Sequence, residues 1–75
     1  MSERAIDVVA EMVANVMTVG VEVGDRVAVG DTLILLESMK MEIPVLAEND
    51  GTVLQVRVGP GDVVQEGDVL VTLSS

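Results

Sequence analysis

An internal repeat of 37 residues constrains the fold of this 75-residue chain more than any other feature. Residues 23–33 are echoed by residues 60–70, with Gly-Asp pairs, valines and leucines in matching places. The match continues backward, pairing Ala10-Glu11 with Ala47-Glu48. Because a repeat of this kind marks one structural unit used twice, we interpret residues 3–37 and 40–74 as two copies within a single domain, 1–75. Lys40 falls at their junction.

Each copy reads as short strands joined by glycine turns. The chain holds seventeen valines, which are stiff at χ1 and favour strands. Glycine permits positive φ and aspartate accepts hydrogen bonds from nearby amides, so two Gly-Asp pairs per copy predict turns. These pairs are Gly24-Asp25, Gly30-Asp31, Gly61-Asp62 and Gly67-Asp68. The composition therefore predicts an all-β fold.

The expected strands are Ile6–Val9, Asn15–Val19, Val27, Thr32–Ser38, Met41–Val45, Thr52–Val56, Val63-Val64 and Val69–Thr72. One segment conflicts with this prediction, since apolar residues between Val8 and Met17 recur at helical spacing. Its repeat partner, 45–54, follows Pro44 and contains the turn signal Asn49-Asp50-Gly51. Two copies should share one backbone, so we predict strand–turn–strand in both.

The two copies are expected to pack face to face, with valines and leucines from both between them. The short join at residues 38–41 predicts a tight hairpin. Its tip would carry Met39 and Lys40.

The composition excludes several classes of function. Cysteine and histidine are absent, which removes thiolate chemistry, the commonest general base and the commonest zinc ligand. Without aromatic residues there is no platform for stacking bases. A formal charge of −9 repels phosphate backbones and anionic lipid. We predict no metal site, no binding of nucleic acid or membrane, a cytoplasmic location and a monomer. The initial Met favours a complete small protein.

Lys40 is the only lysine of the chain, and it stands between two methionines. Most lysines are solvated surface residues, but its uniqueness and its place at the repeat junction argue against that role alone. A nucleophilic lysine must be largely neutral, which requires burial or a neighbouring cation. The neighbours here are Glu37 and Glu42, which favour the ammonium form. The remaining interpretation is that another enzyme modifies Lys40.

These residues resemble a biotinyl domain, also called a biotin carboxyl carrier domain, of the biotin/lipoyl attachment family. The resemblance runs from about Val8 to Leu73 and rests on Glu37-Ser38-Met39-Lys40-Met41, Gly30-Asp31-x-Leu33, Ile43 to Ala47 and Gly51-Thr52-Val53. It implies a flattened barrel of two four-stranded antiparallel sheets with pseudo-two-fold symmetry. The attachment lysine would lie on a hairpin turn opposite the termini.

The resemblance also implies a non-catalytic carrier function. A biotin–protein ligase would join biotin to Lys40 through an amide, with Glu37, Ser38, Met39, Met41 and Glu42 as its recognition residues. The arm would carry a carboxyl group between a biotin carboxylase and a carboxyltransferase. Two alternatives stay open. Ser38 is more typical of lipoyl domains, whereas the two flanking methionines fit only the biotinyl domain. An unmodified adaptor domain of the same fold is the other alternative.

Overall fold

A computed structural model describes residues 4–74 as two antiparallel sheets of short strands. The strands are β1 (Ala5–Val9), β2 (Ala14–Val19), β3 (Arg26–Val27), β4 (Thr32–Ser38), β5 (Met41–Leu46), β6 (Gly51–Val56), β7 (Val63–Val64) and β8 (Val69–Ser74). Each expected strand is present, with ends that differ by at most two residues. The segment with helical periodicity forms strands β1 and β2, as the repeat predicted. Glu3, the first residue of the first copy, lies outside the described residues, as do residues 1, 2 and 75 of the predicted domain.

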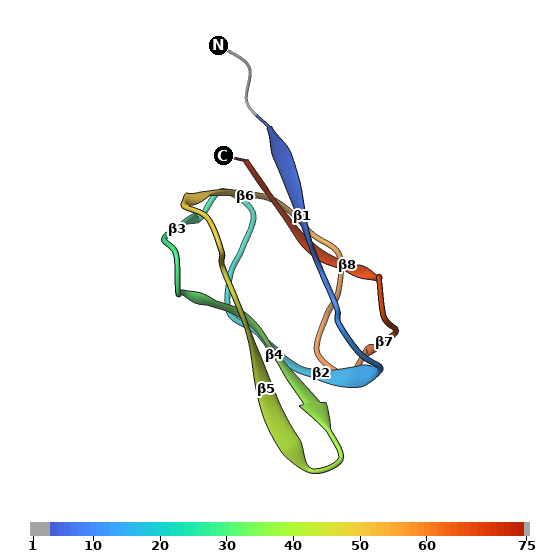
Figure 1. Ribbon diagram of the computed structural model, residues 1–75. Helices are drawn as coiled ribbons and strands as arrows, with labels where there is room; N and C mark the ends of the chain where they lie inside the picture. The colour runs from blue at the N-terminus through green and yellow to red at the C-terminus, as the bar shows by residue number, and fades with distance from the viewer. Residues whose placement is uncertain (1–3, 75) are drawn as a thin grey trace.

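The sheets exchange strands between the two copies of the repeat. One sheet has the order β1-β8-β6-β3 and the other β5-β4-β2-β7 (Figure 1). Each sheet therefore combines two strands from each copy. The expectation that the copies pack face to face as separate units was wrong in this respect. Each copy completes the hydrogen bonding of the other, which pairs strands that a single copy would leave as edges.

The pseudo-two-fold symmetry implied by the resemblance extends to the irregularities of the sheets. The pairing of β1 with β8 shifts register between Val8 and Val9, and that of β5 with β4 shifts at the equivalent place. The shifts in the β2–β4 and β6–β8 ladders are also equivalent. Such bulges bend a strand locally and increase its twist. The offset of 37 residues thus describes the backbone as well as the sequence.

The four Gly-Asp pairs form turns of one design. Each glycine has a φ between 89° and 96°, which an L side chain rarely adopts. Each aspartate then accepts a hydrogen bond at its carboxylate from the amide three residues earlier, at 2.8–2.9 Å. Its own amide donates to the carbonyl of that same residue. The predicted turns are confirmed, and their carboxylates bind backbone amides.

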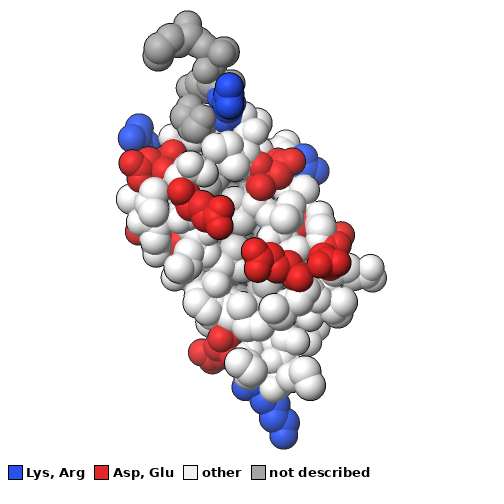
Figure 2. Space-filling view, viewed as in Figure 1, with Lys and Arg blue, Asp and Glu red and all other residues white. Residues whose placement is uncertain are grey.

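The core lies between the two sheets and repeats the same symmetry. Its fully buried large side chains are Leu33, Ile34, Leu36, Leu70, Leu73, Val53, Val64 and Val71. Most of them come from β4 and β8, each of which is paired on both sides within its sheet. Among residues 4–74 no helix could cross a membrane. Acidic side chains are spread over the body, and the basic ones lie at the periphery of the face in Figure 2.

Candidate functional site: the β4–β5 hairpin

Lys40 lies at the tip of the two-residue turn that joins β4 to β5. Ser38 pairs with Met41 at the base of the turn. Met39 and Lys40 have φ values of 50° and 66°, so both are in the left-handed region. Two central residues with positive φ define a type I′ turn, whose twist matches that of the flanking strands. The sequence predicted the hairpin but not this backbone, because such turns usually carry glycine or asparagine.

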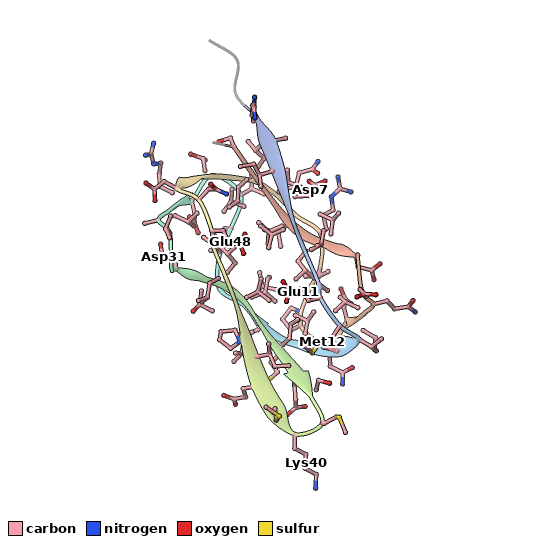
Figure 3. All side chains as sticks on the ribbon, viewed as in Figure 1. Asp7, Glu11, Met12, Asp31, Lys40 and Glu48 are labelled. Carbon is pink, nitrogen blue, oxygen red and sulfur yellow. The ribbon has the colours of Figure 1, made fainter. Side chains whose placement is uncertain are left out.

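The side chains at the tip are displayed to solvent. Met39 is 91% exposed and Met41 is 65% exposed, which is unusual for large apolar side chains. Lys40 is exposed as well. Figure 3 shows its side chain pointing away from the body at one end of the molecule. The opposite end holds the paired residues Ala5 and Ser74, near the two ends of the chain. The tip is therefore the part of the domain that a partner meets first from that direction.

The six residues singled out from the sequence all lie on this hairpin, but on different faces. Glu37 pairs directly with Glu42, one step from the Ser38–Met41 pair. Successive side chains of a strand point to opposite faces, so the two glutamates lie on one face of the hairpin and Ser38 and Met41 on the other. A partner that reads the whole set must therefore contact both faces.

The glutamate face continues across the sheet. Asn15 on β2 pairs with Glu37, and Val63 on β7 pairs with Asn15. The neighbouring row, which contains Leu36, is buried, so the glutamate row lies on the outer surface of the sheet. The hairpin therefore has two carboxylates on its outer face, next to the exposed methionines of its tip.

The hairpin offers an amine and no groups that would activate it. In the described part of the chain no three carboxylates gather as a metal site would require. Residues 37–42 also do not line either of two surface hollows found in that part. The reactive group that the hairpin offers is the primary amine of Lys40, on a long side chain that points away from the body. That geometry fits covalent attachment of an acyl group, because nothing around the amine blocks the approach of a second protein.

The comparisons with known proteins agree with this geometry. The family model described as "Biotin-requiring enzyme" matches residues 5–73. A relative from Mycolicibacterium smegmatis, "Biotinylated protein TB7.3 homolog", is 66% identical over 41 residues, which are 55% of this chain and 58% of the relative. "Biotinylated protein TB7.3" of Mycobacterium tuberculosis is 61% identical over the same share of each chain. The match thus spans somewhat more than half the length of these relatives.

Solved structures share the fold. A single-chain, multi-domain long-chain acyl-CoA carboxylase superposes with a TM-score of 0.88 and 30% identity, over 93% of this chain and 7% of that one. The urea carboxylase of Kluyveromyces lactis gives 0.87 and 30%, over 97% and 6%. The lipoyl domain of the 2-oxoglutarate dehydrogenase complex of Azotobacter vinelandii gives 0.73 and 25%, over 100% and 98%. The chain therefore belongs to the biotin/lipoyl attachment family, which its model describes as biotin-requiring enzymes.

Proposed function

We propose that this domain is a biotin carrier and that Lys40 is the residue to which biotin is attached. The observation that carries the proposal is the display of the only lysine at the tip of a type I′ turn, between two exposed methionines. A biotin–protein ligase would transfer the acyl group of biotinyl-adenylate to the ε-amine. The amide forms as the acyl–phosphate bond breaks, AMP leaves, and the ammonium group of Lys40 loses two of its three protons and its positive charge.

The chain itself contributes display and rigidity. The turn is fixed by the β4–β5 ladder, which runs six pairs from Thr32–Leu46 to Ser38–Met41. A ligase that binds this hairpin does not have to order it first, which lowers the entropic cost of each encounter. Met39 and Met41 supply adaptable apolar contacts. Glu37 and Glu42 set the direction of approach on the outer face. The attachment reaction therefore needs catalytic groups from the ligase alone.

The partners that use the loaded domain would be a biotin carboxylase and a carboxyltransferase. Bound biotin supplies the capacity to hold a carboxyl group. The domain adds tethering, which raises the local concentration of the arm at each active site. Support comes from the two carboxylases whose structures this chain resembles. We further propose that the carrier is cytoplasmic. We also propose that it is a monomer, since a charge of −9 opposes self-association.

A lipoyl carrier is the second candidate, favoured by Ser38 and by the resemblance to the lipoyl domain from Azotobacter vinelandii. Its superposition is poorer than those of the two carboxylases, at 0.73 against 0.88 and 0.87. Met39 is the stronger discriminator. An aspartate at its place, as in lipoyl domains, would present a charge where this chain presents a fully displayed apolar side chain. We therefore place biotin first.

Mass spectrometry of the intact protein tests the assignment. We expect one biotin on the wild-type chain after co-expression with a biotin–protein ligase, and none on Lys40→Arg. Label on Lys40→Arg would show that the site is wrong. Co-expression with a lipoyl ligase is the matched control for the cofactor. The double variant Met39→Asp/Met41→Ala should keep its fold and lose biotin labelling, and undiminished labelling would remove the reason to prefer biotin over lipoate.

A further inference from the structure

The sandwich is open along the side that holds β1 and β5, one edge strand of each sheet. A groove of about 660 Å³ lies there. Its walls come from residues 6–12 and 43–49, which are the same positions of the two copies. Leu36 and Leu73, also equivalent, form its floor. Val29 and Gly30 also line the groove, on the side of the second wall. Most of the lining is thus symmetric, and the groove lies close to the pseudo-two-fold axis.

The walls expose apolar side chains at matching places. Val9 is 41% exposed and its counterpart Leu46 is 45% exposed. Met12, which follows β1, is 40% exposed. Contiguous apolar surface with a polar rim is typical of interaction sites.

The charges around the groove have one sign. Glu11 and Glu48 are equivalent residues on opposite walls, and Asp7 lies on β1 (Figure 3). Among the described residues that line the groove there is no lysine or arginine. Figure 2 shows acidic side chains on both sides of an apolar strip, with the basic ones at the edges of the view. The carboxylate of Asp7 accepts a hydrogen bond from the hydroxyl of Thr72 at 3.0 Å, whereas Glu11 and Glu48 are exposed.

The backbone of one wall can accept a further strand. In the described chain β1 pairs only with β8, so its other edge is open. β5 also has one partner, but Pro44 within it has no amide hydrogen to donate. An extended segment added along β1 would gain main-chain hydrogen bonds and place alternate side chains over the groove. Its apolar side chains would face the groove at Val9 and Leu46. Its long basic side chains would lie on the outer face and reach the exposed carboxylates of Glu11 and Glu48 at the rim.

We propose that the groove between β1 and β5 is a docking surface for an extended segment of a partner protein in which apolar residues alternate with lysine or arginine. A second copy of this chain is a poor occupant, because it would bring the carboxylates of two rims together. Residues 37–42 do not line the groove. A partner bound there leaves the tip of the hairpin free, so docking and use of the Lys40 arm are compatible.

A defined peptide tests the proposal on the unmodified full chain. The probe is a blocked heptapeptide of alternating lysine and valine, titrated in low salt and followed by amide chemical shifts. We expect shifts concentrated in residues 5–12 and 43–49. Glu11→Gln/Glu48→Gln should weaken binding about fivefold, as expected for two lost surface ion pairs. A peptide of alternating glutamate and valine should not bind.

Glu22→Gln/Glu37→Gln is the matched control, since it removes the same net charge from positions that do not line the groove. This control should change the affinity for the peptide less than twofold, which corresponds to a free energy no larger than that of about one surface ion pair. For the apolar contact, Leu46→Ser should weaken binding and Val23→Ser should not. Absence of binding, shifts centred elsewhere, or equal losses in both double variants would overturn the proposal. Biotin labelling of the Glu11→Gln/Glu48→Gln variant should equal wild type, so failure of docking and failure of the carrier assignment are distinguishable.

Discussion

Glu37 and Glu42 stand directly opposite each other across the β4–β5 ladder, one step below the turn that carries Lys40. Directly opposed side chains of an antiparallel pair have Cβ atoms about 4.5–5.5 Å apart, and like charges at that separation are destabilising. The fold itself gains nothing from this pair. Its position beside the proposed attachment site supports a role in recognition by another protein.

Replacing Glu42 by Gln should therefore stabilise the domain while impairing its modification. We expect the free energy of unfolding to rise by about 0.5 kcal/mol, because a neutral amide at position 42 removes the repulsion between the two carboxylates. Urea denaturation measures this change. The initial rate of biotin labelling should fall. Glu48→Gln removes one exposed carboxylate that lies outside the β-strands, and an equal gain in that variant would attribute the effect to general charge relief.

The turn is a second place where one substitution should raise the stability of the domain and lower its rate of modification. Met39 has a φ of 50°, a region that asparagine enters far more readily than methionine. Met39→Asn should raise the free energy of unfolding by about 0.5–1 kcal/mol and lower the labelling rate, because a polar side chain replaces the apolar contact. Met41 lies in β5, where asparagine is unfavourable. Met41→Asn should therefore lose stability, and a gain there would contradict the backbone explanation.

Much of the fold could be predicted from the repeat. The repeat predicted strands for residues 8–17, where the spacing of apolar residues alone predicted a helix, and the structure confirms the strands. Local signals were sufficient for the Gly-Asp turns, because glycine and aspartate act within a few residues. Strand ends differed because tertiary pairing extends them, as for β8, which continues to Ser74 beside Ala5.

The exchange of strands between the copies could not be predicted in the same way. Pairing of β1 with β8 joins residues far apart in sequence, and no local pattern records which partner a strand chooses. The left-handed backbone at Met39 and Lys40 could not be predicted either, because neither residue is the glycine or asparagine that usually marks such a turn. The groove between β1 and β5 depends on the exchange of strands. It exists because strand exchange brings the first strand of each copy to the same open side.

The repeat does not explain why residue 51 is glycine where the first copy has Ala14, but the packing around it does. A Cβ atom at this position would overlap the carbonyl oxygen of Ser74 on β8. The equivalent residue, Ala14, is buried with its Cβ accommodated. Gly51→Ala should lower the free energy of unfolding by about 2 kcal/mol, as expected for overpacking against the backbone. Ala14→Gly should cost about 0.5–1 kcal/mol. Equal losses in thermal denaturation would contradict this account.

Asp50 makes a contact whose counterpart is missing from the first copy. Its carboxylate accepts a hydrogen bond from the amide of Val29 at 2.9 Å. The equivalent residues are Val13 and Glu66. Val13 is 62% exposed, so it provides neither the acceptor nor much burial. Since the backbone hydrogen bonds of the turns and loops recur at the 37-residue offset, the geometry for the missing bond should already be present.

Val13→Asn should supply that acceptor without adding charge to an acidic domain. We expect the free energy of unfolding to rise by about 1 kcal/mol, which corresponds to an increase in Tm of about 4–8 °C for a domain of this size. Exchange of the Glu66 amide hydrogen should slow by a similar free energy. Val23→Asn is the control, because Val23 is equally exposed at 65% and its counterpart, Pro60, contributes no such bond. If both variants gain equally, removal of an exposed valine explains the change and the structural equivalence of the two loops is wrong.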